Sequence, residues 1–402
     1  MVSPVAQRSE HRHRGACAVI LLMAIVTACA ACGGGGGGGS AADATHASLT
    51  FYRPPDVLST GTPGDVLSKE PVALDPSLHG TGWKVQYVST TPAGDRVPVS
   101  GILIQPLTPA PTGGYPVVLW DHGTTGLGDQ CAPSAYAPFN LFGAAALLDA
   151  GDMIAATDYE GLGIPDEIHP YLVGVAEGHS VLDAARAART VGGGNVTVSW
   201  GWSQGGHASL FARSLQKTYA PELDFRGTVA QAPVTDLATF LLPGRTNPDV
   251  FPFTAEAILA WSEVYHETDL TDLVVVADAE KARLAQQACT GDIVNNTTRP
   301  LDEIFRSDPQ NLATWKEAVQ VNSVEVGDTQ APVLLTHGDA DPLVPIAGTV
   351  ALDEQLCARH IPTQFLRDTT WGHETAWALT LDEADAWIQA RIAGEPPPSN
   401  CP

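Results

Sequence analysis

Short apolar runs alternate with segments of helical periodicity along most of this chain. The apolar runs are rich in β-branched residues and end at polar turns, as strands buried on both faces do. They lie at residues 85–88, 97–105, 117–120, 153–157, 196–200, 227–231, 333–337 and 363–366. The segments with apolar residues at helical spacing lie at residues 144–150, 181–190, 204–219, 346–359 and 375–392. Strands that alternate with helices in this way predict an α/β fold with a mostly parallel sheet, covered by helices on both faces.

Two regions depart from this alternation. Residues 48–80 are rich in Pro, Gly, Ser and Thr, and we expect them to be irregular. Residues 234–332 contain little strand signal, and we interpret them as a helical cap inserted between two parts of the core, residues 48–233 and 333–402. In the cap we expect helices at 255–265, 280–287 and 312–319. The run at 273–276 is an ambiguous strand signal.

The first residues have the pattern of an export signal. Three arginines precede an apolar run at residues 16–28, which is shorter than the roughly 20 residues that a membrane span needs. The sequence "VTAC" that ends at Cys29 resembles the lipobox of bacterial lipoproteins; Cys32 is a second candidate, and an ordinary cleaved signal is the alternative. We therefore predict a lipoprotein-type signal peptide at residues 1–28 and a glycine-rich tether at residues 29–47. The protein is expected to be exported, either anchored to the cell envelope through Cys29 or secreted.

The charge and the cysteine content indicate which binding functions and which covalent links the chain can have. The formal net charge is −24 at pH 7 and no basic cluster follows the signal, so the sequence offers no surface for nucleic acid. Four cysteines follow the tether, which in an exported chain indicates two disulfides. We expect Cys131–Cys289, joining an early loop to the cap, and Cys357–Cys401, pinning the C-terminal tail. The sequence has no CxxC pair or histidine-rich cluster among these cysteines, so we expect no metal and no cofactor.

One serine stands between two glycines where a predicted strand meets a predicted helix. The stretch Gly201-Trp202-Ser203-Gln204-Gly205 fits the G-x-S-x-G pattern, in which a strained turn exposes a nucleophilic serine at the sheet edge. The two glycines leave room for that turn. The backbone N–H of Gln204 would begin the next helix, where the helix dipole favours negative charge. We therefore predict Ser203 as a nucleophile and Gln204 N–H as an oxyanion donor.

A nucleophilic serine needs a base and a carboxylate partner, which in this fold follow it in the order Ser, Asp, His. The stretch "HGDADPLVP" at residues 337–345 ends a strand, and within it Asp341 matches a D-x-x-V-P pattern, whereas Asp339 is expected to be a turn residue. His373 precedes the last amphipathic helix, where a loop can carry it over the sheet edge. His360 ends a predicted helix and is expected at the surface. The histidines expected to be packed core groups are His179, His207 and His337.

The second oxyanion donor should come from the loop after an early strand. The stretch "VVLWDHGTTG" at residues 117–126 supplies such a loop, and its His-Gly pair resembles the HG turn of lipases and esterases. We predict Thr124 N–H as the donor. Asp121 is an alternative functional residue in this loop, or a structural turn acid.

Several longer stretches extend the pattern beyond these single residues. They are "FYRPP" at 51–55, "WDHGTTG" at 120–126, "CAPS" at 131–134, "TDYEGLGIPDEIHPYLVG" at 157–174 and "GWSQGGHA" at 201–208. In this order they resemble the secretory lipase family. The resemblance implies an α/β-hydrolase core with a helical cap, a Ser203, Asp341 and His373 triad, and an oxyanion hole from Gln204 and the loop from Asp121 to Thr124. It also implies activity on carboxylic esters, including acylglycerols.

We therefore expect an exported serine ester hydrolase that acts through an acyl-enzyme on a small-molecule or lipid ester. A peptidase or acyltransferase with the same triad is the alternative among enzymes, and a non-catalytic surface-binding protein is the alternative outside them. Apolar cap residues should divide between core packing and an acyl tunnel over Ser203, so that medium or long acyl esters are cleaved better than acetate. These residues are Phe240, Leu241, Leu242, Phe251, Phe253, Ile258, Leu259 and Trp261. Membrane association is expected through the N-terminal lipid.

Overall fold

The computed structural model of the protein describes residues 50–54, 60–139, 141–241, 247–273, 289–290, 307–308 and 311–402. The predicted signal peptide and tether, with Cys29 and Cys32, lie outside the described residues. Ser48–Pro402 forms one compact unit. In the part of the chain that is described, no helix is both long and apolar enough to cross a membrane.

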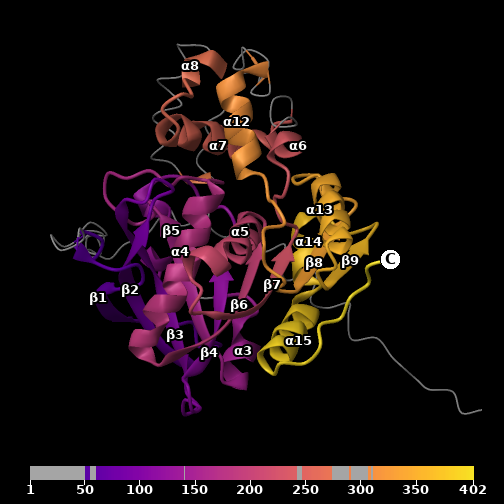
Figure 1. The fold of residues 1–402 in the computed structure, drawn as a ribbon. Coiled ribbons are helices and arrows are strands. Elements are labelled where there is room, and N and C mark those ends of the chain that lie inside the picture. The colour runs from indigo at the N-terminus through magenta and orange to yellow at the C-terminus, as the bar shows by residue number, and fades with distance from the viewer. Residues whose placement is uncertain are drawn as a thin grey trace, which may run out of the picture. The chain divides into compact units, whose positions relative to one another are not determined.

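A nine-stranded sheet runs through this unit in the order β1-β2-β3-β5-β4-β6-β7-β8-β9 (Figure 1). The strands β1, β2 and β3 pair in antiparallel fashion, β3 pairs antiparallel with β5, and every pair from β5 to β9 is parallel. The strands are β1 (Val66–Val72), β2 (Gly80–Thr90), β3 (Arg96–Pro106), β4 (Tyr115–Asp121), β5 (Met153–Glu160), β6 (Gly193–Trp202), β7 (Asp224–Gln231), β8 (Val333–Gly338) and β9 (Thr363–Asp368). The predicted mostly parallel sheet is confirmed.

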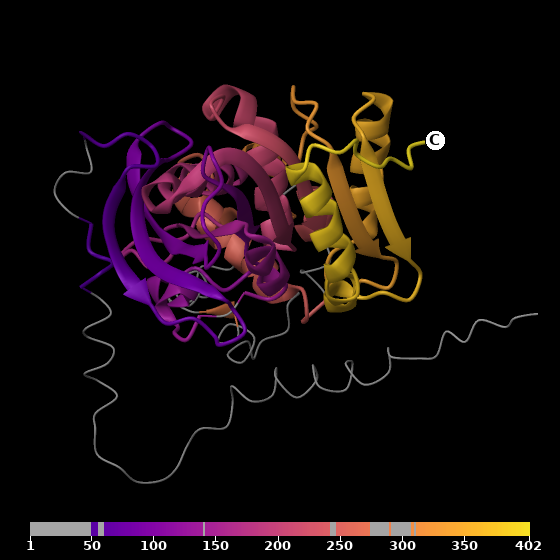
Figure 2. The same cartoon turned by 90° about the horizontal axis from the view of Figure 1, so that it is seen from below.

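Helices cover both faces of the sheet (Figure 2). Those of the core are α3 (Ala144–Ala150), α4 (Gly174–Ala188), α5 (Gln204–Tyr219), α13 (Ile346–Ala358), α14 (His373–Ala378) and α15 (Leu381–Ile392). One apolar cluster joins α4 and α5 to the sheet, and a separate one joins α3 and α15 to it. The strand β8 shows why continuous apolar runs suit this position: Leu334 packs with the α15 cluster, whereas Val333 and Leu335 pack with α13.

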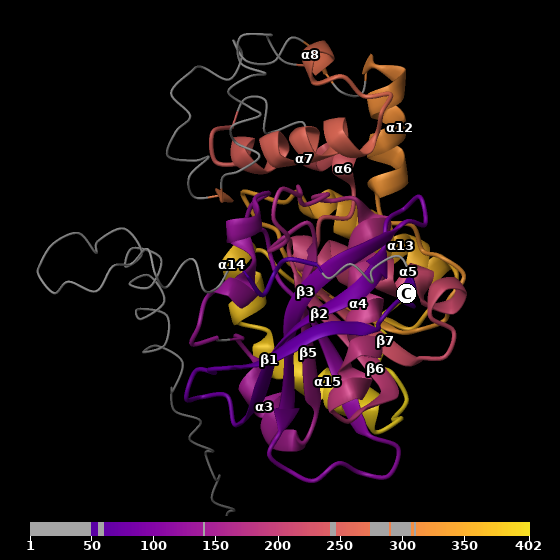
Figure 3. The same cartoon turned by 90° about the vertical axis from the view of Figure 1, so that its left-hand side faces the viewer.

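Four described helices between β7 and β8 lie beyond one end of the strands (Figures 1 and 3). They are α6 (Leu237–Leu241), α7 (Phe251–Val264), α8 (Leu270–Leu273) and α12 (Ala313–Asn322). They share an apolar cluster with Leu127, Val344 and residues near the start of α4. The expected helices at 255–265 and 312–319 correspond to α7 and α12, and the ambiguous run begins in α8. The expected helix at 280–287, together with Leu242, lies outside the described residues.

Two expectations about single elements were wrong. Residues 48–80 are not irregular throughout, because β1 forms there as an edge strand that pairs on one side only. Its half-exposed residues carry no apolar run, so no strand pattern marks it. The expected helix at 375–392 is two helices, α14 and α15. They separate around Thr380, whose Oγ1 accepts a 2.7 Å hydrogen bond from Gln231 of β7.

Two disulfides join the predicted cysteine pairs. Cys131 is bonded to Cys289 and Cys357 to Cys401, with Cα atoms 5.5 Å and 5.4 Å apart, respectively. Beside the first disulfide, Thr290 N–H donates to the carbonyl oxygen of Thr125 at 3.1 Å. The first disulfide therefore fastens a short segment of the region between β7 and β8 to the loop after β4.

Candidate active site

The serine between the two glycines occupies a sharp turn. Strand β6 ends at Trp202, α5 begins at Gln204, and Ser203 between them has φ 58° and ψ −117°. A positive φ is uncommon for a residue with a side chain and marks a strained backbone. A Cβ at Gly201 would collide with the carbonyl group of Gly205, and one at Gly205 with the carbonyl oxygen of Asp121. Both glycines are therefore required by the close packing around this turn.

An aspartate and a histidine from two later elements meet beside this turn. His373 begins α14, and its Nδ1 lies 2.7 Å from Oδ2 of Asp341, which follows β8. The N–H groups of Leu343 and Val344 both donate to Asp341 Oδ1 at 2.9 Å. Nε2 of His337 lies 3.1 Å from Asp341 Oδ2. Asp341 is thus oriented by partners on both of its oxygens.

The same contacts determine the charge of Asp341. Burial by itself raises the pKa of this carboxyl, but hydrogen bonds from His337 and His373 and the charge of His373 hold the pKa well below its usual value. The carboxylate is therefore ionised. It can fix the His373 tautomer with Nε2 directed away from Asp341 and can stabilise the imidazolium.

The alternative residues lie elsewhere. The Asp339 carboxylate pairs with Arg367 of β9 and makes no contact with His373. His360 follows α13 and is exposed, as expected. His179, His207 and His337 are buried and hydrogen-bonded, also as expected.

Ser203 and His373 line one cavity of about 150 Å³. Its polar side includes Thr124, Tyr171 and Thr290, and the oxygen atoms of Thr124 and Tyr171 lie 2.9 Å apart. Its apolar lining consists of Trp202, Phe240, Phe253, Leu343 and Val344. Of the apolar residues predicted for the cap, Phe240 and Phe253 line this cavity. Phe240 also belongs to the buried cluster, together with Leu241, Phe251, Ile258, Leu259 and Trp261.

The predicted oxyanion residues occupy different positions. Gln204 is the first residue of α5, directly after Ser203, and Thr124 lines the cavity. The Asp121 side chain is buried under the turn, where its Oδ2 accepts a 2.5 Å hydrogen bond from Ser209 of α5, and it does not line the described cavity. Burial raises the pKa of Asp121 well above its usual value, so this carboxyl is neutral.

Sequence reasoning missed three polar residues of the cavity: Tyr171, Thr290 and Glu374, the last of which directly follows His373. Tyr171 lies in the loop before α4, and Thr290 follows Cys289. The predicted disulfide from Cys131 to Cys289 was the one signal that could have drawn Thr290 toward the loop after β4. Among the described residues, no cluster of His, Cys, Asp and Glu is arranged to hold a metal ion.

The parallel sheet, the helices on both faces and the strained serine turn after β6 define an α/β-hydrolase fold. The chain belongs to the secretory lipase family, whose sequence profile matches residues 138–400. It is 25% identical over 397 residues to Lipase 10 of Candida albicans, covering 88% of this chain and 82% of that protein. It is also 25% identical to a probable inactive lipase of Mycobacterium tuberculosis, covering 86% of this chain and 82% of that protein.

The fold is similar to that of a solved lipase. The closed state of Candida antarctica lipase A superposes with a TM-score of 0.76 at 18% identity, covering 87% of each chain. Membership of a lipase and esterase family supports carboxylic ester hydrolysis as the general activity.

Proposed function

We propose that the protein is an exported serine hydrolase of carboxylic esters, with Ser203 as nucleophile, His373 as general base and Asp341 as its partner. One observation carries the proposal: Ser203 on its strained turn and the Asp341-paired His373 line the same cavity. The family supports ester hydrolysis, and this geometry supports the serine mechanism.

The reaction proceeds in two halves. His373 removes the proton from Ser203 Oγ as that oxygen attacks the ester carbonyl, and the resulting imidazolium protonates the departing alcohol. Water, deprotonated by His373, then attacks the acyl-enzyme. The imidazolium returns this proton to Ser203 Oγ as the carboxylic acid is released. The negative charge of Asp341 stabilises the imidazolium in each half.

The developing oxyanion is bound by the backbone N–H groups of Gln204 and Thr124. Each such donor contributes roughly 3 kcal/mol to transition-state stabilisation when it is held in place before the reaction. Asp121 supports the oxyanion site as a structural residue. Its neutral carboxyl accepts a hydrogen bond from Ser209 of α5, and its backbone packs against Gly205.

The substrate is an ester with an apolar acyl group, of which acylglycerols are an example. Phe240, Phe253 and Leu343 give the cavity an apolar wall. The cavity of about 150 Å³ is smaller than the roughly 300–1,000 Å³ of typical ligand pockets, so a longer acyl chain must extend beyond its described walls. Medium or long acyl esters are expected to be cleaved better than acetate.

Export and anchoring belong to the same proposal. Residues 1–28 act as the signal peptide, and Cys29, or else Cys32, carries the lipid. The glycine-rich tether at 29–47 then lets the hydrolase domain work away from the membrane surface.

A fluorophosphonate probe followed by peptide mass spectrometry tests the enzyme class. We expect one adduct, on Ser203, and hydrolysis of nitrophenyl esters but not of a matched peptide amide. Absence of an adduct would favour the non-catalytic binder; one relative of this chain is named a probable inactive lipase. Efficient amide cleavage, or acyl transfer to an added alcohol in preference to water, would favour the peptidase or the acyltransferase.

A further inference from the structure

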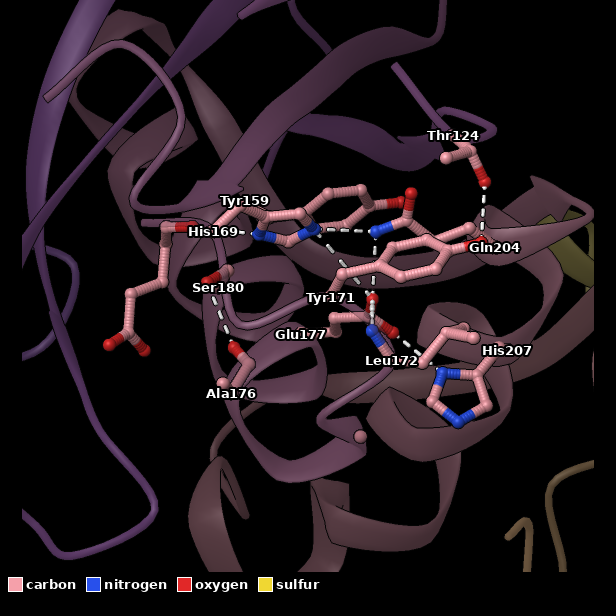
Figure 4. Close-up of polar contacts among 12 residues, drawn as sticks. Thr124, Tyr159, His169, Tyr171, Leu172, Ala176, Glu177, Ser180, Gln204 and His207 are labelled. Atoms are coloured by element: carbon pink, nitrogen blue, oxygen red, sulfur yellow. Dashed lines mark hydrogen bonds and ion pairs between the residues drawn. The ribbon is translucent and has the colours of Figure 1, made fainter. Parts of the chain in front are cut away.

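A carboxylate that is shielded from solvent lies behind the serine turn. Glu177 is in the first turn of α4 and its side chain is 0% exposed. Its Oε1 accepts hydrogen bonds from Leu172 N–H at 3.0 Å and from Gln204 Nε2 at 2.8 Å (Figure 4). Its Oε2 lies 2.6 Å from Nδ1 of His207 on α5. The mechanism proposed above does not use this group, although one of its partners directly follows the nucleophile.

Glu177 and His207 form a buried hydrogen-bonded pair. His207 lies between two acceptors, Glu177 Oε2 and the carbonyl oxygen of Asn322, the latter 2.8 Å from Nε2. Both ring nitrogens of His207 thus have a partner, and the ring holds Glu177 Oε2 in place. Burial by itself raises the pKa of Glu177, but the charge and hydrogen bond of His207 and the hydrogen bond from the Gln204 amide hold it below its usual value.

The pair fixes the side chain of Gln204. One amide hydrogen of Gln204 points to Glu177, and the other points to His169 Nε2, 2.7 Å away. Nδ1 of His169 lies 2.8 Å from the carbonyl oxygen of Glu160, so Nδ1 carries the proton and Nε2 is free to accept. Burial lowers the pKa of His169 to about 4, which keeps the ring neutral. Both amide donors of Gln204 are therefore committed, and the residue that follows Ser203 cannot rotate freely.

The same carboxylate holds one wall of the cavity. Leu172, whose N–H binds Glu177, has φ 54°, a conformation that a leucine rarely adopts without support. The preceding residue, Tyr171, brings its hydroxyl to Thr124 in the cavity, as Figure 4 shows. Trp261 of α7 donates to the carbonyl oxygen of Tyr171 at 3.0 Å. Glu177 thus connects the serine turn, the Thr124 wall and the helices over the site.

We propose that Glu177 is a positioning residue for ester hydrolysis, acting through Gln204 and Leu172 without touching the substrate; this inference rests on the proposed function. Oxyanion donors stabilise the transition state only when they are held in the correct place before the reaction. A displacement of about 1 Å in a site of this kind can lower the rate on the order of 100-fold. Glu177 prevents such a displacement of Gln204 N–H and of the Thr124 loop.

The test compares Glu177→Gln with Asp183→Asn in the full-length protein. Glu177→Gln keeps the shape of the side chain but removes its charge and turns one acceptor edge into a donor. Asp183 is the matched control, because it lies on the same helix, is equally buried and accepts hydrogen bonds from Ser89, Tyr219 and Arg186, none of which adjoins Ser203 or Tyr171. We measure kcat and KM on a nitrophenyl ester, the rate of fluorophosphonate labelling and the Tm.

For Glu177→Gln we expect kcat and the labelling rate to fall by about 10-fold or more, with KM changed less than about twofold. Asp183→Asn should lower Tm and leave kcat within about twofold. Wild-type kcat in folded Glu177→Gln, or an equal loss of kcat in both variants at equal Tm, would overturn the positioning role.

A second variant covers the case in which Glu177→Gln does not fold. Gln204→Leu removes the amide that Glu177 holds but keeps the backbone N–H, and it should show the same loss of kcat at nearly constant KM. Wild-type kcat in Gln204→Leu would contradict the proposal. If the wild-type protein itself is not labelled at Ser203, the proposed function fails, and the positioning role falls with it.

Discussion

At the scale of single residues, the proposed chemistry depends on which of two nearby acids, Asp339 or Asp341, faces His373. Asp341 lies 2.7 Å from His373, whereas Asp339 pairs with Arg367 at the surface. The D-x-x-V-P pattern distinguishes the two in the sequence, because Leu343 and Val344 supply the N–H groups that orient Asp341.

The first prediction separates these two acids. Asp341→Asn should lower kcat on the order of 10⁴-fold, because an amide at this position favours the wrong imidazole tautomer. Asp339→Asn, the control, should leave kcat nearly unchanged. Steady-state kinetics with a soluble ester decides, and the reverse order of the two effects would mean that the acid has been assigned incorrectly.

A second residue-scale prediction concerns Glu256 of α7. Its side chain is 0% exposed, and burial raises its pKa from 4.5 to about 8, although a hydrogen bond from Thr290 opposes the change. Between these two values the folded state holds a proton that the unfolded state releases. Stability contributed by the neutral acid is therefore lost as pH rises through this window, by up to about 1.4 kcal/mol per pH unit.

Glu256→Gln should remove that slope from the free energy of unfolding, measured by denaturant titration at several pH values. Glu263→Gln, at an exposed position of the same helix, is the control and should keep the slope. An unchanged slope in Glu256→Gln would show that this carboxyl is not neutral in the folded protein.

At the scale of elements, hydrophobic patterning predicted the buried strands and most core helices, because those elements repeat their burial pattern along the chain. The pattern did not predict strand β1, because this edge strand buries too few residues to show a regular apolar pattern. The pattern also did not predict the start of α4, because Gly174 and Gly178 weaken a helix pattern. These two glycines are required because Phe211 and Leu215 of α5 pack closely against them.

The residues of the candidate site also fall into two groups, those that a local sequence motif predicts and those that only tertiary packing brings to the cavity. Ser203, Gln204 and Asp341 lie in local motifs whose spacing is visible in the sequence. Tyr171 and Thr290 reach the cavity from separate loops, so their proximity depends on tertiary packing and one disulfide. Glu177 carries no motif, and its three partners come from two separate segments, the loop before α4 with Leu172 and helix α5 with Gln204 and His207.

The third prediction compares the two disulfides. Cys131→Ala with Cys289→Ala should lower the free energy of unfolding by roughly 3–5 kcal/mol and raise KM, because the disulfide fastens the segment that carries Thr290. Cys357→Ala with Cys401→Ala should lower stability without changing KM, since that bond joins α13 to the C-terminal tail. Denaturant titration and steady-state kinetics measure both effects. An unchanged KM in the first variant would contradict a role of the disulfide in holding Thr290 at the cavity.

At the scale of the whole molecule, we propose separate tasks for the acidic hydrolase domain and the N-terminal segment. The domain carries the proposed chemistry, and we propose that the segment determines where that chemistry takes place. The family name suggests release, whereas the lipobox and the glycine tether suggest retention at a membrane.

The fourth prediction tests this retention. Wild-type protein expressed in a bacterial host should partition with membranes and carry a lipid on its N-terminal cysteine, as shown by mass spectrometry. Cys29→Ser should release active enzyme, and Cys32→Ser, the control, should not. A soluble wild-type form with an unmodified N-terminus would contradict the anchor, and release by Cys32→Ser alone would move it to Cys32.

The central claim is that Ser203 attacks the ester, and Ser203→Ala tests it most directly. With Asp341 and His373 unchanged, the variant loses only the nucleophilic oxygen. Steady-state kinetics of this variant on a nitrophenyl ester should show kcat lowered by roughly 10³-fold or more. The Tm, which checks folding, should be unchanged. Turnover near the wild-type rate in a folded Ser203→Ala protein would contradict the assignment.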